Sequence, residues 1–226
     1  MAISIIGAVN ATAVDGGNAT IDISSLSPQT DDLVVIASGT AMRSGNEGRI
    51  GNALSYTQDS NLASGQRLRT AYKKYVSSET SITVEGSGNA SDALVAVAIV
   101  LRGQDTTTPI DVTSTATGGN STNPDCPSIT PSSNDCCILA IANSVVSDTS
   151  VTAPTNYTKP TNGSINAVDT NSYTLAIAYR LLSGGAGAAE NPANFTAWST
   201  GVWQSITMAI RPAAVLNSSH RMFMVF

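Results

Sequence analysis

The chain has 226 residues, of which 12% are charged and 42% are hydrophobic, and its formal net charge is −5. This composition excludes a disordered chain, which is poor in apolar residues and rich in charge. The sequence pI near 4.6 argues against a nucleic-acid surface, which needs clustered Lys and Arg. No window approaches 18 apolar residues, and the opening residues lack the basic region of a secretory signal. We therefore expect neither membrane insertion nor a targeting segment.

Short runs of β-branched residues, separated by Gly, Pro and Asp, follow one another along the first half. Residues 19–24 (ATIDIS) alternate apolar and polar, which is typical of a half-buried strand. Residues 33–38 (LVVIAS) are mostly apolar and predict a central strand buried on both faces. In residues 93–103 (ALVAVAIVLRG) the β-branched content favours strand over helix. The strands expected in this half are residues 3–9, 19–24, 33–38, 54–58, 67–77, 81–86 and 93–103, with a loop over 39–53.

The second half follows the same order after a polar connector, GQDTTTP at 103–109, which we interpret as a turn between neighbouring strands. The strands expected here are residues 110–115, 126–130, 136–145, 155–158, 172–182, 194–198 and 202–211. Six landmarks return in one order, 101 to 109 residues later. They are GGNAT at 16–20 and GGNST at 118–122, Pro28 and Pro131, Asp32 and Asp135, Tyr56-Thr57 and Tyr157-Thr158, AYKKYVS at 71–77 and AYRLLSG at 178–184, and IVLRG at 99–103 and MAIRP at 208–212.

Recurrence of this kind indicates an internal duplication. About fourteen short strands without an amphipathic helix predict an all-β fold, a jelly-roll-like two-sheet β-sandwich built from two pseudo-symmetric repeats. We expect one sandwich domain over residues 1–211, with repeat one at 3–103 and repeat two at 110–211. Residues 212–226 would be a C-terminal extension. Two tandem sandwiches of immunoglobulin size are the alternative.

Three cysteines occur, at Cys126, Cys136 and Cys137. Aligning the repeats at Asp32 and Asp135 puts Cys136 and Cys137 at the places of Leu33 and Val34, so we interpret them as small core residues. A disulfide between Cys126 and Cys136 stays open. The residues expected in the core are Val34, Val35 and Ile36, and their counterparts Cys137, Ile138 and Leu139.

Basic residues gather locally only at Arg67, Arg69, Lys73 and Lys74. On a strand, Arg67, Arg69 and Lys73 share one face, because side chains alternate between the two faces. We interpret this face as solvated or as part of an interface.

No set of residues with catalytic spacing is found. His220 is the only histidine and lies outside the duplicated region, whereas a hydrolase needs its histidine held in a cleft by a third group. One histidine and no CxxC motif leave a zinc-type site without ligands. The DGGN sequence at 15–18 offers oxygens to calcium but is typical of a plain turn. We therefore predict no enzymatic activity, no cofactor and no metal site.

A carbohydrate-binding surface would need exposed aromatic rings that stack on sugars. The candidates are Trp198, Tyr56, Tyr157 and Phe195. Trp203 is expected to be buried, because it falls in the last strand of its repeat, in line with core positions.

Three groups of residues together resemble a known family. They are the strand from Asp32 to Val35, the strands with Tyr72-Lys73 and Tyr179-Arg180, and Leu101-Arg102-Gly103 with Pro109-Ile110-Asp111. They resemble the duplicated β-sandwich virion proteins of tailed bacteriophages, which are capsid-decorating or tail-associated components. The resemblance covers nearly all of residues 1–211 and carries no active site. The second unit departs from it, since Arg-Pro stands where the pattern has Arg-Gly.

This resemblance implies a non-enzymatic structural protein of the virion, made in the bacterial host cytoplasm. Its expected partners are other capsid or tail subunits and further copies of itself, with no nucleic acid and no membrane insertion. A capsid-decorating (cement) role is favoured, because the chain has no heptad, collagen-like repeat or fibre segment. A tail-associated or host-adsorption protein and a carbohydrate-binding module, with a host surface glycan as partner, are the alternatives.

The final residues are unusually apolar. Residues 221–226 read RMFMVF, one arginine followed by five large apolar side chains. An unprotected terminus of this kind favours pairing with another surface. We expect it to dock on a neighbouring subunit; folding back onto its own sandwich is the alternative. The residues expected to bind a partner are His220, Arg221, Met222, Phe223, Met224, Val225 and Phe226.

Overall fold

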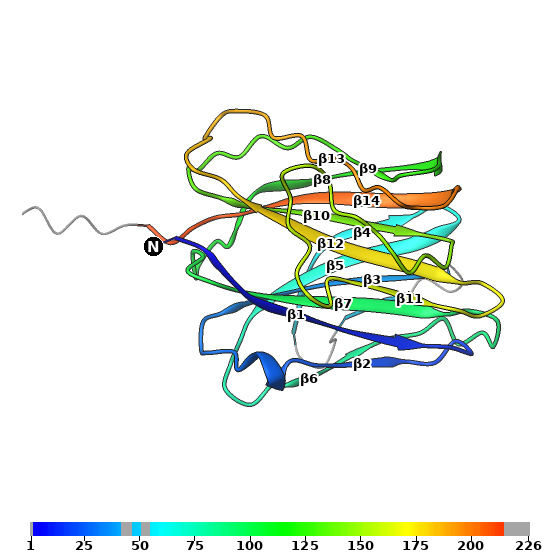
Figure 1. Cartoon of the computed structure of the whole chain (residues 1–226). Coiled ribbons are helices and arrows are strands. Elements are labelled where there is room, and N and C mark those ends of the chain that lie inside the picture. Colours follow the sequence, from blue (N-terminus) through cyan, green and yellow to red (C-terminus); the bar gives the residue numbers. More distant parts are fainter. Residues whose placement is uncertain (1, 42–46, 51–54, 215–226) are drawn as a thin grey trace, which may run out of the picture.

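The computed structural model describes residues 2–41, 47–50 and 55–214. The first of its two large sheets is antiparallel and has the strand order β1-β7-β3-β5-β4 (Figure 1). Its strands are β1 (Ser4–Ala13), β7 (Leu94–Arg102), β3 (Leu33–Ala41), β5 (Gln66–Lys74) and β4 (Thr57–Ala63). The strand over LVVIAS lies at the centre of this sheet, and all nine residues of β3 are buried, as the apolar run predicts.

The second large sheet has the order β11-β12-β10-β14-β8. Its strands are β11 (Ser164–Ala167), β12 (Tyr173–Leu181), β10 (Cys137–Ser144), β14 (Gly201–Ile210) and β8 (Ile110–Ser121). Strands β1, β7, β3, β5 and β4 hold the places in the first sheet that β8, β14, β10, β12 and β11 hold in the second. Each half of the chain thus forms one sheet. The pseudo-symmetry of the two repeats, which requires their superposition, stays a prediction.

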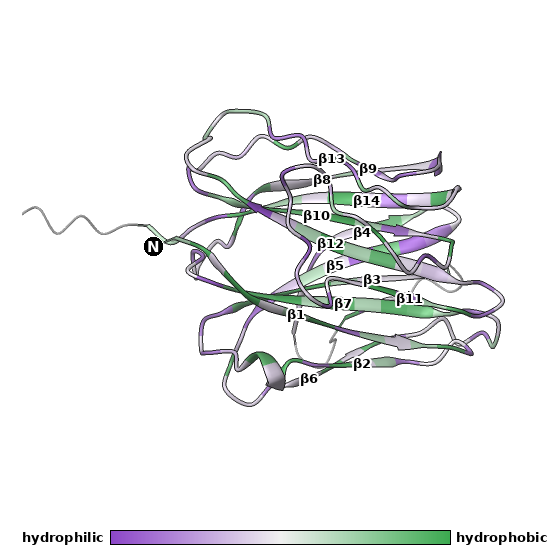
Figure 2. Cartoon of the chain, viewed as in Figure 1, coloured by the Kyte–Doolittle hydropathy of each residue, from purple (hydrophilic) through white to green (hydrophobic). Residues whose placement is uncertain are grey.

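Two short strand pairs cover the outer faces of the large sheets. Strands β2 (Ala19–Asp22) and β6 (Ser81–Val84) lie over the first sheet, with the 3-10 turn η1 (Ser24–Leu26) beside them. Strands β9 (Asp125–Cys126) and β13 (Ala193–Asn194) lie over the second. The molecule is a sandwich with a cover on each side, and the ribbon has long hydrophobic stretches in inner strands such as β7 and β10 (Figure 2).

Three apolar clusters fill the spaces between these layers. The central cluster joins the two large sheets and contains Val35 from β3 and Leu139 from β10. The outer clusters lie under the short strand pairs and contain Val34 and Ile138 respectively. The all-β two-sheet sandwich predicted from the sequence is confirmed. All six predicted core residues are buried, with 0 or 1% exposure for Val34, Val35, Ile36, Cys137, Ile138 and Leu139.

The alignment of the two repeats was wrong by one residue at the central strands. Leu33 and Cys137 both face the central cluster, whereas Val34 and Ile138 both face outward. Because successive side chains of a strand point to opposite faces, the counterpart of Leu33 is Cys137 and not Cys136. Cys136 lies just before β10, in the outer cluster.

Two local predictions were also wrong, and two stretches of strand were not predicted. Strand β8 continues to Ser121, beyond the strand predicted at 110–115, and includes most of GGNST at 118–122. Residues 155–158 form no strand: Tyr157 donates its amide to the Pro154 carbonyl at 3.0 Å, which closes a turn. Strand β11, at residues 164–167, was not predicted. The connector at 103–109 does not join neighbouring strands of one sheet, because β7 lies in the first sheet and β8 in the second.

Side-chain amides tie the two large sheets together inside the sandwich. Gln66 on β5 donates to the Val202 carbonyl at 3.1 Å, and Gln204 on β14 donates back to the Gln66 carbonyl at 3.1 Å. Asn143 on β10 donates to the Arg67 carbonyl at 3.2 Å. In the described part of the chain, no helix has the length and apolar character needed to cross a membrane.

Candidate functional site

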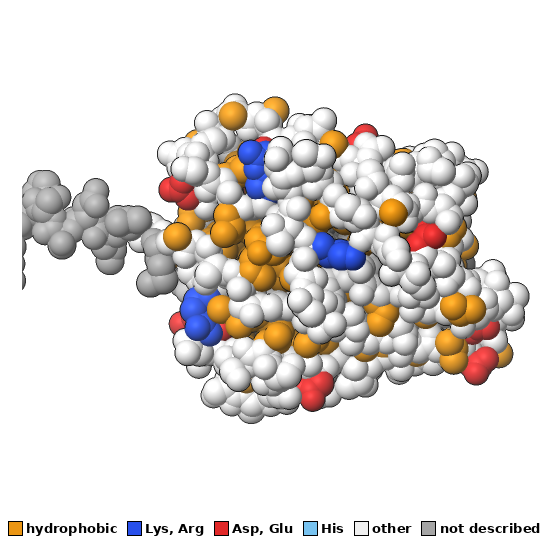
Figure 3. Space-filling model, in the orientation of Figure 1, with side chains coloured by type: hydrophobic (Ala, Val, Ile, Leu, Met, Phe, Trp, Pro, Cys, Tyr) orange, Lys and Arg blue, Asp and Glu red, His pale blue; other side chains and the backbone are white. Residues whose placement is uncertain are grey.

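An open groove of about 630 Å³ lies at the end of the sandwich where the chain enters β1 and leaves β14. Its walls come from the first residues of the chain, the connector after β7, the loop before β10, the end of β12 and residues 211–214. Leu181 lines it and is 47% exposed, which is unusual for a large apolar side chain in this molecule. Hydrophobic side chains gather on the visible face towards this end (Figure 3).

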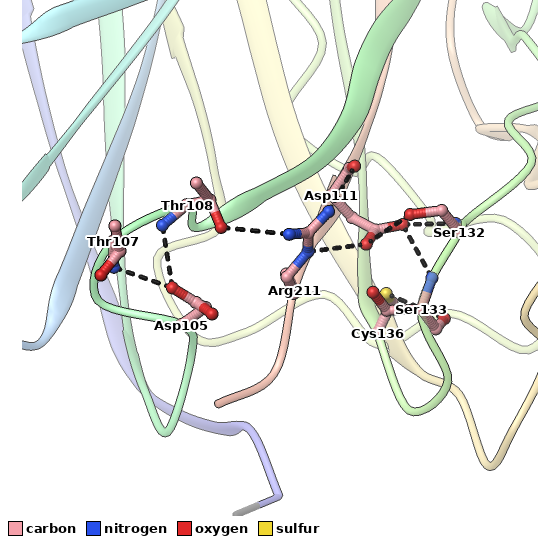
Figure 4. A network of polar contacts seen from close by, with 8 residues as sticks. All are labelled: Asp105, Thr107, Thr108, Asp111, Ser132, Ser133, Cys136 and Arg211. Carbon is pink, nitrogen blue, oxygen red and sulfur yellow. Dashed lines mark hydrogen bonds and ion pairs between the residues drawn. The ribbon is translucent and has the colours of Figure 1, made fainter. Parts of the chain in front are cut away.

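Arg211 organises one wall of the groove. Its Nε donates to Oδ1 of Asp111 at 3.0 Å, and its Nη2 donates to the Asp111 carbonyl at 3.1 Å. On the other side, Nη1 donates to the Thr108 hydroxyl at 3.1 Å (Figure 4). The Asp111 carboxylate also accepts the amides of Ser132 and Ser133, at 2.5 and 3.2 Å. Arg211 therefore connects the end of β14 to β8 and, through Asp111, to the loop before β10.

The Asp111 carboxylate is a structural acceptor. Its side chain has no exposed surface, and burial alone would raise its pKa. Hydrogen bonds from Ser133, Ser132 and Arg211 outweigh burial and lower the pKa to about 2. The group thus stays ionised near neutral pH, where it cannot act as a general acid.

A second arginine brace lies in the first half of the chain. Arg102, the last residue of β7, donates through Nε and Nη2 to the two carboxylate oxygens of Asp32, both at 2.7 Å. Asp32 also accepts the Gln29 amide at 2.7 Å. Two-point pairing of this kind fixes the geometry of both side chains. Arg102 and Arg211 end corresponding strands but use acidic partners from different places in the fold.

The last described residues are held in place by backbone hydrogen bonds. The Asp105 amide donates to the Arg211 carbonyl at 2.8 Å, and the Ala213 amide donates to the Gly103 carbonyl at 2.9 Å. Arg211 donates its own amide to the Pro109 carbonyl at 2.8 Å. The chain is therefore anchored to the β7–β8 connector as far as Ala213.

The outer face of each large sheet carries one cluster of a tyrosine, a glutamate and a basic residue. In the second sheet, Glu190 Oε1 accepts from the Tyr157 hydroxyl at 2.9 Å and from Arg180 Nη1 at 2.7 Å. Burial and the negative charge of Glu190 raise the pKa of Tyr157. The phenol therefore stays protonated and acts as a hydrogen-bond donor.

The first sheet holds the corresponding cluster. Lys73 donates to Glu79, and its Nζ lies 5.6 Å from the centre of the Tyr56 ring. Burial and the charge of Glu79 raise the pKa of Tyr56. The repeated YT and AYK/AYR landmarks contain the tyrosines and the basic residues of both clusters. The two glutamates were not identified from the sequence. Their rarity was the available signal, since the chain has four glutamates in all.

The basic face on β5 is not solvated. Arg67 and Arg69 are 6% and 4% exposed, and Arg67 Nε lies 3.4 Å from Glu47, whose side chain has no exposed surface. Arg67 also donates to Asn61 at 2.9 Å. Among the predicted basic residues, Lys74 is the more exposed one, at 44% of its side chain, and it pairs with Asp31 at 3.2 Å.

Three of the four aromatic residues expected on a sugar-binding surface are buried, and the fourth is half-buried. Phe195 and Trp198 are 0% and 3% exposed, and their rings meet edge to face with centres 5.7 Å apart. Tyr157 is 8% exposed, and Tyr56 is half-buried. Trp203 is buried, as predicted, at 7%. The stacking platform proposed for these residues was therefore wrong.

The three cysteines are free and buried, so no disulfide joins Cys126 to Cys136. Burial raises the pKa of all three thiols, that of Cys136 to about 12, and keeps them in the unreactive protonated form. Within residues 2–41, 47–50 and 55–214, no three His, Cys, Asp or Glu side chains come together as a metal site would need.

The residues predicted to bind a partner, His220 to Phe226, lie outside the described residues. No known protein family, no curated protein and no solved structure matches the chain.

Proposed function

We propose that the chain is a non-enzymatic structural subunit of a tailed-bacteriophage virion, and that it decorates the capsid through contacts with other subunits. The observation that carries this proposal is the role of the residues on which the resemblance rests. Asp32 opens the central strand of the first sheet and is braced by Arg102. Asp111 opens β8 and is braced by Arg211. Three of the residues that carry the resemblance, Asp32, Arg102 and Asp111, thus take part in ion pairs at strand ends.

Ion pairs of this kind hold strands together, and they favour a structural role of the protein over a catalytic one. The charged groups at the groove are engaged in hydrogen bonds, and the groove itself exposes apolar surface at one end of the sandwich. Exposed apolar patches on a rigid fold favour contacts with other protein surfaces. The step from this fold to a virion rests on the resemblance, because fold alone does not fix function.

The test is to image purified particles that contain or lack this subunit. Density repeated over the lattice of the head is expected for a decorating protein. Density confined to the tail would overturn the decorating role in favour of the tail-associated one. Particles whose protein content does not include the chain would overturn the virion assignment itself.

A further inference from the structure

The groove at the end of the sandwich has apolar walls and acidic edges. Leu181 and the half-buried Leu182 provide apolar surface, and Asp105 and Asp135 also line the groove, where the charge of Arg211 is paired with that of Asp111. Asp105 accepts the amides of Thr107 and Thr108, both at 2.8 Å, and these bonds lower its pKa, so the carboxylate stays charged. The groove is therefore suited to an apolar segment that carries positive charge.

The chain itself contains such a segment. Residues 215–226 read VLNSSHRMFMVF and include no acidic residue, with Arg221 placed directly before five large apolar side chains. Arg221 complements the acidic edges, and the apolar run complements the walls. Apolar anchors beside one complementary charge are a common way in which a short peptide fills a groove.

The length of chain between the groove and this segment allows the segment to reach the groove of a second copy. Ala214 lines the groove, and the chain is anchored there up to Ala213. Arg221 follows seven residues later, a distance of at most about 24 Å in an extended chain. An extended span of this length is long enough for the segment to reach another molecule whose groove end faces this one. An exchange between two copies fills both grooves with the same contacts, as a two-fold assembly requires.

We infer that residues 221–226 of one copy dock in the groove of a second copy, with Arg221 against Asp105 and Asp135 and the apolar run against Leu181. This inference names a partner for the assembly proposed above. Its test uses the purified full-length chain, so its failure would leave the particle experiment unaffected.

Cysteine cross-linking distinguishes exchange from fold-back. One full-length chain carries Leu181→Cys, a second carries Met224→Cys, and the two are mixed under mild oxidation. The native cysteines are buried and do not compete. A disulfide-linked pair with one chain of each kind is expected. Val168→Cys replaces Leu181→Cys in the control, because Val168 is 66% exposed and does not line the groove. Equal cross-linking in the control, or none in the mixture, overturns the inference.

A chain that carries both Leu181→Cys and Met224→Cys tests fold-back directly. If dilution leaves it a monomer with an internal disulfide, the segment occupies its own groove and the exchange is wrong.

Association in solution gives an independent measurement. Sedimentation of the full-length chain is expected to show dimers or larger assemblies, and Leu181→Asp is expected to weaken them at least about tenfold. Val168→Asp is the matched control, since Val168 is 66% exposed and does not line the groove. If Leu181→Asp lowers the melting temperature, its effect on association could come from unfolding. Met224→Asp, in the docking segment, then serves as the second variant and is expected to weaken association in the same way. A full-length chain that stays monomeric at all concentrations overturns the inference.

Discussion

Ile36 in the middle of β3 has no exposed surface and belongs to the cluster beneath β2 and β6. Truncating it to alanine leaves a cavity that the neighbouring strands cannot close. Ile36→Ala is therefore expected to lower the free energy of unfolding by about 2–5 kcal/mol, measured by urea denaturation. Val76→Ala is the control, because that side chain is 49% exposed and its loss should cost less than about 0.5 kcal/mol. Equal effects of the two changes would contradict the burial of Ile36.

Asp111 gives the protein a stability that depends on pH. Its pKa is about 2 when folded, below the ordinary value of 3.8, so the unfolded chain takes up its proton first as the pH falls. The stabilisation is complete above the ordinary pKa and is lost as the pH falls through about 2. Asp111→Asn should lower the free energy of unfolding by about 1.5–3 kcal/mol at neutral pH. The difference from the unchanged chain should shrink between pH 3.8 and about 2.

Unfolding followed at several pH values checks this expectation. Asp125→Asn is the matched control, since Asp125 is exposed on β9. A difference between Asp111→Asn and the unchanged chain that stays constant down to pH 2 would show that Asp111 does not hold its low pKa.

The sequence pattern predicted burial correctly where burial follows from the apolar character of the strand's own residues. Val34 to Ile36 form a continuous apolar run, and such a run is buried wherever the sheet is covered on both faces. Arg67 and Arg69 were misjudged, because their burial depends on Glu47 in a distant loop and on Asn61 and Gln58 of the adjacent strand. Periodicity along one strand carries no information about partners supplied by other segments of the chain.

At the scale of the element, Gly119 has no side chain and so leaves room on β8 for a tryptophan ring of the adjacent strand. Gly119 pairs with Trp203 across β8 and β14, and a Cβ on it would lie 2.6 Å from a carbon of the indole ring. Gly119→Ala should displace this ring and lower the free energy of unfolding by about 1–3 kcal/mol. Tryptophan fluorescence should shift to the red as Trp203 gains contact with water. Thr117→Ala on the same strand adds no atom near the ring, and the prediction fails if it gives the same shift.

Elements were predicted where strands are central and long, and missed where they are short and at an edge. Strand β11 pairs with β12 only and has four residues, so its sequence lacks a burial pattern. Residues 155–158 have the composition of a strand, but Asn156 takes a positive φ of 67° and turns the chain. The candidate groove was not foreseen, because its walls come from five separate segments that only the fold brings together.

At the scale of the whole molecule, the two sheets share one core. The central cluster contains residues of both halves. Between the sheets, the Gln66 side chain donates to the Val202 carbonyl, and the Gln204 side chain donates to the Gln66 carbonyl. Neither half can therefore bury its inner face alone. The full chain is expected to unfold in one transition, with equal calorimetric and van't Hoff enthalpies. Two separate transitions would show that the halves are independent domains.

Expressing the first half of the chain alone tests more directly whether the two sheets depend on a shared core. Residues 1–103 would expose the inner face of the first sheet, including Leu33, Val35 and Ile99, which have no exposed surface in the full chain. A contiguous apolar face of this size drives association. The fragment is therefore expected to aggregate or to pair with itself, as followed by sedimentation. Mixing it with residues 104–214 should restore a soluble species with one copy of each half. A soluble monomer of residues 1–103 with its own cooperative transition would contradict the shared core, because each sheet would then be stable without the other.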